Sequence, residues 1–267
     1  MNNENVQKNN NLKIILLFFI SFISIIIISN FDFFTMSNEI ANEMISNSLL
    51  RLIGGIVFVI LMYMIGYKKL ISFKRPILNS LLIIIPGIII SINNFPIIAY
   101  LDGRADILEP SYTIYIFMIE CISTGFFEEI IFRGILLFLL LQKLPSTKKG
   151  MYLAIFISSA IFSLSHLINL FGGVNLNDTV LQVGYSFLMG LMWAVIYLKT
   201  RNIWMSVILH STYNFFGLVL FRLGYVNNRY DNVTIITTVL LAILVAIYTL
   251  YISLKIDVNK LEELYEI

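Results

Sequence analysis

The sequence predicts an all-α fold, a polytopic membrane bundle of about eight transmembrane helices. Of its 267 residues, 58% are hydrophobic and only 13% are charged, whereas soluble domains carry about 25% charged residues. The mean hydropathy is +0.87. Apolar stretches recur along the chain, and their length is close to the 20 residues that a helix needs to cross the hydrocarbon layer.

Eight stretches fit this length, and each of them predicts one helix. They cover residues 14–35, 49–67, 77–92, 112–141, 151–170, 179–198, 203–221 and 234–254. The third is short and contains Pro86, which predicts a kink. The fourth is long, at about 30 residues, so we expect it to tilt, bend near Gly125 or extend beyond the bilayer.

The first stretch follows a polar tail, residues 1–12, and resembles a signal peptide. No small-residue cleavage site follows it, because Asn30, Phe31 and Asp32 come next. We therefore interpret it as a retained first span. No repeat or linker interrupts the later stretches, so residues 1–267 are predicted to form a single membrane domain.

The lysines and arginines predict the orientation in the cell membrane. With eight spans and both termini in the cytosol, most of these residues fall in cytosolic segments, as the positive-inside rule requires. The net charge of +2 gives no argument for nucleic acid, so the predicted environment is the lipid bilayer. Trp193 and Trp204, near span ends, are predicted to lie at the membrane interface.

The fourth stretch contains a charged triplet in the segment FFEEIIFRGI, residues 126–135. Charges at membrane depth are costly and usually pair or perform a function. Glu129 and Arg133 are four residues apart, so they share a helix face and can pair. Glu128 is rotated by about 100° from Glu129. The sequence therefore predicts one carboxylate neutralised by arginine and one left free, Glu128.

The two histidines of the chain, His166 and His210, both lie in predicted spans. Each has a companion four residues away on the same face: Phe162 before the first and Asn214 after the second. Glu128, the histidines and Asn214 form a candidate polar cluster. Straight helices would place His210 and Glu128 at different depths, so the cluster requires the turn at residues 200–202 to lie deep, lining a water-filled cavity.

Three motifs carry a resemblance to a known family. They read EExxxR at residues 128–133, FxxxH at 162–166 and HxxxN at 210–214. All three are complete, and they occur in the order seen in the CPBP family, the CAAX-protease and bacteriocin-processing proteins also called Abi proteins. The resemblance covers residues 118–217, which we interpret as the catalytic core.

The resemblance implies an intramembrane endopeptidase acting on a peptide or protein substrate in or at the membrane. By this analogy Glu128 is the base that activates water, and His166 assists it or binds metal. His210 and Asn214 would bind metal or stabilise the oxyanion. Glu129 and Arg133 would hold the site in shape, with Phe162 packing beside it.

Two mechanisms stay open at this point. In one, His166, His210 and Glu128 bind a metal such as Zn²⁺, whose fourth position carries water. In the other, Glu128 and His166 activate water directly, while His210 and Asn214 donate hydrogen bonds to the oxyanion. The HExxH pair of soluble zinc peptidases is absent from the sequence.

Another function is also open. The same fold could serve a non-catalytic immunity or regulatory protein of the membrane, in which Glu128 would be dispensable. A transporter is disfavoured because the sequence has no internal repeat.

Overall fold

The computed structural model describes residues 16, 19, 20, 23, 35–64 and 77–261. Within these residues about 80% of the chain is helical, and the prediction of an all-α membrane bundle is confirmed. The helices are α2 (Glu39–Met64), α3 (Ile77–Asn93), α4 (Ile97–Leu101), α5 (Tyr112–Glu129), η2 (Ile130–Leu137), α6 (Phe138–Lys143), α7 (Lys148–Ser165), η3 (His166–Leu170), α8 (Leu176–Thr200), α9 (Ile203–Leu223) and α10 (Asn232–Leu254).

Five of the described helices are long and apolar enough to cross a membrane: α2, α7 with η3, α8, α9 and α10. α3 is apolar but shorter, and Pro86 lies inside it. α5, η2 and α6 follow one another without interruption from residue 112 to residue 143 and include the charged triplet. The chain is a multi-pass membrane protein. The first predicted span, 14–35, lies almost wholly outside the described residues.

The largest difference from the predicted spans is at α2, which begins at Glu39 rather than at residue 49. Asn38 caps this end, because its side-chain oxygen accepts a hydrogen bond from the backbone N–H of Ala41 at 2.8 Å. The first turns contain Glu43 and Asn47 among other polar residues. A prediction based on apolar length therefore leaves these turns out of the span, although their backbone is helical.

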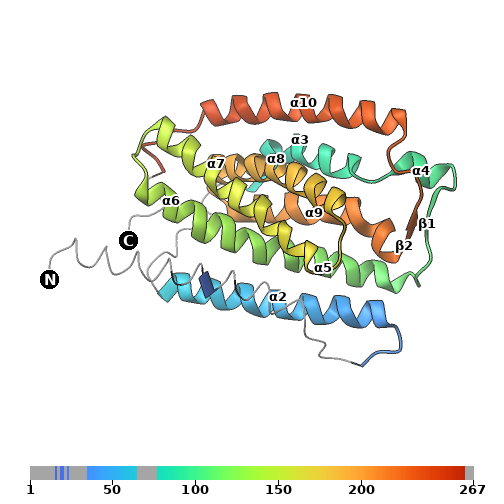
Figure 1. The fold of residues 1–267 in the computed structure, drawn as a ribbon. Coiled ribbons are helices and arrows are strands. Elements are labelled where there is room, and N and C mark those ends of the chain that lie inside the picture. The colour runs from blue at the N-terminus through green and yellow to red at the C-terminus, as the bar shows by residue number, and fades with distance from the viewer. Residues whose placement is uncertain (1–15, 17–18, 21–22, 24–34, 65–76, 262–267) are drawn as a thin grey trace.

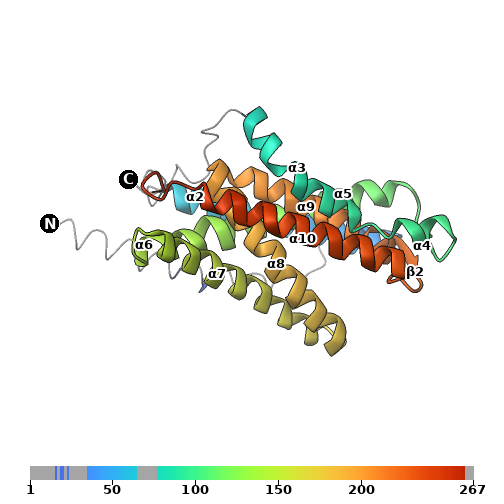
Figure 2. The same cartoon turned by 90° about the horizontal axis from the view of Figure 1, so that it is seen from above.

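α9 lies at the centre of the bundle and packs against α5, α3 and α8 (Figure 1). α2 lies along one edge of the bundle and α10 along the opposite edge, with α5, α7, α8 and α9 between them. Seen from above, α7 and α8 lie side by side on one flank and α3 on the other (Figure 2). Glycines allow the close approaches: a Cβ atom on Gly125 would lie 2.4 Å from the Ser211 hydroxyl of α9.

α5 and α9 run antiparallel, and their offset sets the depth of the site. Phe117 contacts Phe215 at one end of the pair, and Gly134 faces Ile203 at the other. α9 therefore begins opposite Gly134, about 13 Å along the helix axis before Lys143. This recess brings His210 level with Glu128.

The turn between α8 and α9 is accordingly deep, as predicted, but it does not line a water-filled cavity. Thr200 and Asn202 are both fully buried. Protein atoms satisfy much of this turn: the Thr200 hydroxyl donates to the Ile196 carbonyl at 2.7 Å, and Asn202 caps α9 through the backbone N–H of Trp204. Burial of this turn inside the protein therefore explains how His210 and Glu128 come to lie at the same depth.

A two-stranded antiparallel ladder closes the opposite end of the bundle. β1 (Ala105–Ile107) pairs with β2 (Gly224–Val226), with Asp106 opposite Tyr225. Gly224 permits the pairing, because a Cβ atom there would lie 1.8 Å from the Asp106 carbonyl oxygen. The ladder joins the loop before α5 to the segment that leads into α10.

Candidate active site

The predicted pair of Glu129 and Arg133 is present and almost entirely shielded from solvent. An Arg133 Nη1–H donates to Glu129 Oε1 at 2.8 Å, and the side chains are 1% and 0% exposed. A second guanidinium nitrogen donates to the Gly190 carbonyl on α8 at 3.1 Å. The arginine therefore ties the end of α5 to α8.

Arg133 lies in η2, where the backbone takes the wider π-helical turn. A bend near Gly125 was one of three expectations for this stretch, beside a tilt and an extension beyond the bilayer; the irregularity begins at Ile130, directly after the two glutamates. Such segments are rare and often occur at functional sites. All eight residues of η2 are buried, so the wider turn is held in place by its neighbours.

His210 contacts both carboxylates of the triplet. Its Nδ1 lies 3.0 Å from Glu129 Oε1, and its Nε2 lies 3.7 Å from Glu128 Oε2. Glu129 Oε1 thus faces donors from both Arg133 and His210. Because a carboxylate accepts hydrogen bonds, this contact assigns the Nδ1 proton to the histidine and leaves Nε2 directed at Glu128. Glu128 itself is 18% exposed.

Aromatic rings fix the orientation of the imidazole. Trp193 of α8 stacks on His210, with ring centroids 4.2 Å apart and an interplanar angle of 17°. Phe162 of α7 presents an edge-to-face contact at 5.8 Å, and the Arg133 guanidinium lies 4.6 Å from the centre of the Phe162 ring. Phe162 is buried and packs beside the site, as the FxxxH motif suggested.

Trp193 is the residue of this site that sequence reasoning missed. It was predicted to be an interfacial anchor, and that prediction is wrong, because its side chain is 2% exposed and covers His210. Trp204 likewise stacks on Phe126 at 5.6 Å. The proximity of these tryptophans to span ends gave the wrong signal, since α9 begins within the protein and not at the membrane surface.

All four predicted site residues of the cluster line one cavity of about 560 Å³. Glu128 lies on α5, His166 begins η3, and His210 and Asn214 belong to α9. His166 is half-buried and packs edge-to-face on Phe162, with ring centroids 5.2 Å apart. The structure therefore brings together residues that the sequence separates by up to 86 positions.

Binding of a metal ion is not favoured by the arrangement of these side chains. Catalytic zinc takes three protein ligands. Among the described residues, no group of three or more His, Cys, Asp or Glu side chains is placed to hold an ion. Glu128 and His210 approach each other, but His166 does not complete a set with them.

The fold and the cavity define a class: a helical membrane protein with a buried glutamate–histidine centre. Residues 110–216 match the family model for type II CAAX prenyl endopeptidase Rce1-like proteins. This range includes the whole centre and confirms the resemblance drawn from the three motifs. At the level of the family, the match indicates a CAAX-protease-like intramembrane endopeptidase. No curated protein and no solved structure matches the chain.

Proposed function

We propose that the protein hydrolyses a peptide bond in a membrane-associated protein or peptide, with Glu128 as the base that activates water. One observation carries the proposal. His210 lies between Glu128 at 3.7 Å and Glu129 at 3.0 Å, in a cavity that His166 and Asn214 also line. A free carboxylate beside an oriented imidazole is an arrangement suited to general acid–base chemistry.

The roles of the two glutamates differ because their surroundings differ. Glu129 is fully buried and already accepts hydrogen bonds from Arg133 and His210. Glu128 is partly exposed to the cavity, where a water molecule and a substrate carbonyl can reach it. Glu129 is therefore a positioning residue, and Glu128 is the catalytic residue.

The reaction then proceeds in balanced steps. Glu128 takes a proton from water while the water oxygen attacks the carbonyl carbon of the substrate. The oxyanion accepts hydrogen bonds from the Asn214 amide and, when its Nε2 carries a proton, from His210. Glu128 returns the proton to the amide nitrogen as the C–N bond breaks, giving a carboxylic acid and an amine. His166, which lines the same cavity, helps to orient the water.

Comparative peptidomics of membranes tests this proposal. Cells carrying the wild-type chain are compared with cells carrying Glu128→Gln, and we expect a set of peptides and shortened proteins to disappear in the variant. Glu120→Gln is the matched control, since Glu120 lines the same cavity but pairs with Arg51 at 3.3 Å. Identical peptide sets in wild type and Glu128→Gln, at equal expression, would refute the proposal and favour the non-catalytic immunity or regulatory role.

A chelator arm addresses the predicted Zn²⁺ site. Membranes are treated with a chelator, then with Zn²⁺, and hydrolysis of the peptides identified above is followed. Loss and recovery of hydrolysis would support a site formed by Glu128, His166 and His210. Hydrolysis that is insensitive to the chelator would support direct activation of water by Glu128.

A further inference from the structure

Two tyrosines line the cavity beside the glutamate–histidine centre, Tyr185 of α8 and Tyr213 of α9. Their ring centroids lie 5.9 Å apart, with an interplanar angle of 47°. Tyr213 comes three residues after His210, so the two side chains share a face of α9, about 4.5 Å apart along the helix axis. His210 and Tyr213 also both contact Trp193, with centroid distances of 4.2 and 6.2 Å.

The hydroxyl groups of these two tyrosines have no hydrogen-bond partner in the described part of the chain. Neither oxygen is enclosed by protein, whereas the Tyr197 hydroxyl, which also lacks a partner among the described residues, is fully buried. Tyr248, outside the cavity, donates its hydroxyl to the Ile83 carbonyl at 2.9 Å. Tyrosine hydroxyls in buried surroundings usually find such a partner. The Tyr185 and Tyr213 hydroxyls are therefore open to a molecule bound in the cavity.

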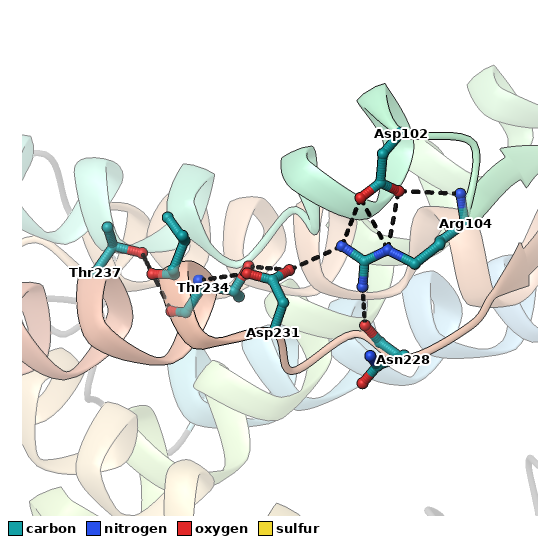
Figure 3. Close-up of polar contacts among 7 residues, drawn as sticks. Asp102, Arg104, Asn228, Asp231, Thr234 and Thr237 are labelled. Carbon is teal, nitrogen blue, oxygen red and sulfur yellow. Dashed lines mark hydrogen bonds and ion pairs between the residues drawn. The ribbon is translucent and has the colours of Figure 1, made fainter.

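The wall that carries Tyr213 is tied to the loop between β2 and α10. The Asn94 amide donates to the Tyr213 carbonyl at 3.2 Å, and Arg229 of that loop donates to the Asn94 carbonyl at 2.8 Å. Arg104 in turn donates to the carbonyl of Asn228, next to Arg229 (Figure 3). A wall that is ordered before binding loses little conformational entropy when a substrate enters.

The main chain of a peptide offers the groups that such hydroxyls can bind. Each peptide unit has one N–H donor and one C=O acceptor, and a tyrosine hydroxyl can both donate and accept. A substrate that enters the cavity gives up hydrogen bonds to water, and a peptide group left unpaired there costs binding free energy. The 5.9 Å between the ring centroids of Tyr185 and Tyr213 corresponds to about two residues of extended chain.

We propose that the Tyr185 and Tyr213 hydroxyls bind the main chain of the peptide substrate and hold it extended across the cavity, with the bond to be cleaved over Glu128. Tyr213, about 4.5 Å from His210 along α9, contacts a peptide unit one or two residues from that bond. Because main-chain groups are the same in every peptide, this contact positions substrates of different sequence.

This inference rests on the proposed function for the class of substrate, but binding alone can test it. Two labelled octamers with the side chains of alanine and leucine are compared. One is a peptide, and the other is a depsipeptide, in which esters replace all the amides and so remove every main-chain N–H. The comparison therefore does not depend on which residues lie at the tyrosines. Binding is measured by fluorescence anisotropy to the full chain in micelles, in a Glu128→Gln background.

We expect the peptide to bind more tightly than the depsipeptide. Tyr213→Phe and Tyr185→Phe should each lower this preference about 2- to 10-fold, the range for one neutral hydrogen bond. Phenylalanine keeps the packing of the ring, so each change removes the hydroxyl alone. Tyr197→Phe is the matched control, because it removes an enclosed hydroxyl from α8 and should leave the preference unchanged. Trp193 fluorescence checks that each variant keeps its fold.

A preference for the peptide that survives both changes overturns the proposal, since the rings would then act by packing alone. Undetectable binding of the peptide, or equal binding of peptide and depsipeptide, also overturns it. The two proposals fail separately. Hydroxyl-dependent preference for the peptide, together with unchanged peptide sets in Glu128→Gln cells, would retain the role of the tyrosines and reject the endopeptidase. Altered peptide sets without this preference would do the reverse.

Discussion

Replacing Glu129 by leucine is expected to destabilise the protein more than any single change on the cavity wall. The carboxylate lies 2.8 Å from the Arg133 guanidinium, which corresponds to about 6 kcal/mol of Coulomb attraction at an effective dielectric constant of about 20. Without it, Arg133 stays charged, because arginine does not lose its proton in proteins. Removing one partner of a buried pair costs about 3–5 kcal/mol of unfolding free energy.

Replacing Arg133 should cost less unfolding free energy than replacing Glu129, and this difference is the sharper test. In Arg133→Met the carboxylate that remains can take up a proton and so avoid a buried charge. The double variant, Glu129→Leu with Arg133→Met, removes both charges and should recover most of the lost stability. It should not recover hydrolysis, because His210 still lacks the acceptor for its Nδ1–H.

Titration with a denaturing detergent in mixed micelles, followed by tryptophan fluorescence, measures these free energies. Trp193 stacks on His210 beside the pair, so its emission reports on the region directly. A cost below about 1 kcal/mol for Glu129→Leu would show that water or lipid headgroups compensate Arg133. A double variant no more stable than Glu129→Leu would likewise refute the account of the pair.

Two further predictions concern the ends of the bundle. Gly150→Ala should lower the free energy of unfolding by about 1–3 kcal/mol, because the new Cβ would lie 2.0 Å from the Pro145 carbonyl oxygen. Gly184→Ala is the control: its Cβ would have nothing within 4 Å, so this change should be neutral or stabilising. Equal effects of the two changes in a denaturant titration would contradict the prediction. The hydrogen bond from the Arg104 side chain lowers the pKa of Asp102 below its usual 3.8. A lowered folded-state pKa stabilises above 3.8 and loses that contribution as pH falls through the folded value, so amide exchange in this loop should accelerate below about pH 3.8, and Arg104→Gln should remove this step.

Much of this architecture can be predicted from sequence because lipid imposes simple rules. The lengths of the apolar stretches place α3, α8, α9 and α10 within a few residues of their observed bounds. Helical periodicity also predicts the pairing of Glu129 with Arg133, since a contact between positions i and i+4 depends on local geometry alone.

What the sequence does not predict depends on contacts between helices. The stacking of Trp193 on His210 requires the offset between α8 and α9, and the π-helical turn at Ile130 requires a particular packing around it. The bond between His210 and Glu129 has the same origin, because it joins residues 81 positions apart.

The position of α10 at the edge of the bundle has a consequence for the surrounding lipid. Of the most apolar 18-residue stretch of α10, only 6% is buried within the protein. Acyl chains therefore cover most of the surface of this helix. The tilt of such a helix responds to the thickness of the bilayer. Its first turn is tied through Asp231 to Arg104, and Arg104 also holds Asn228 beside Arg229. We therefore expect a thinner or thicker membrane to shift the loop between β2 and α10 relative to the rest of the bundle.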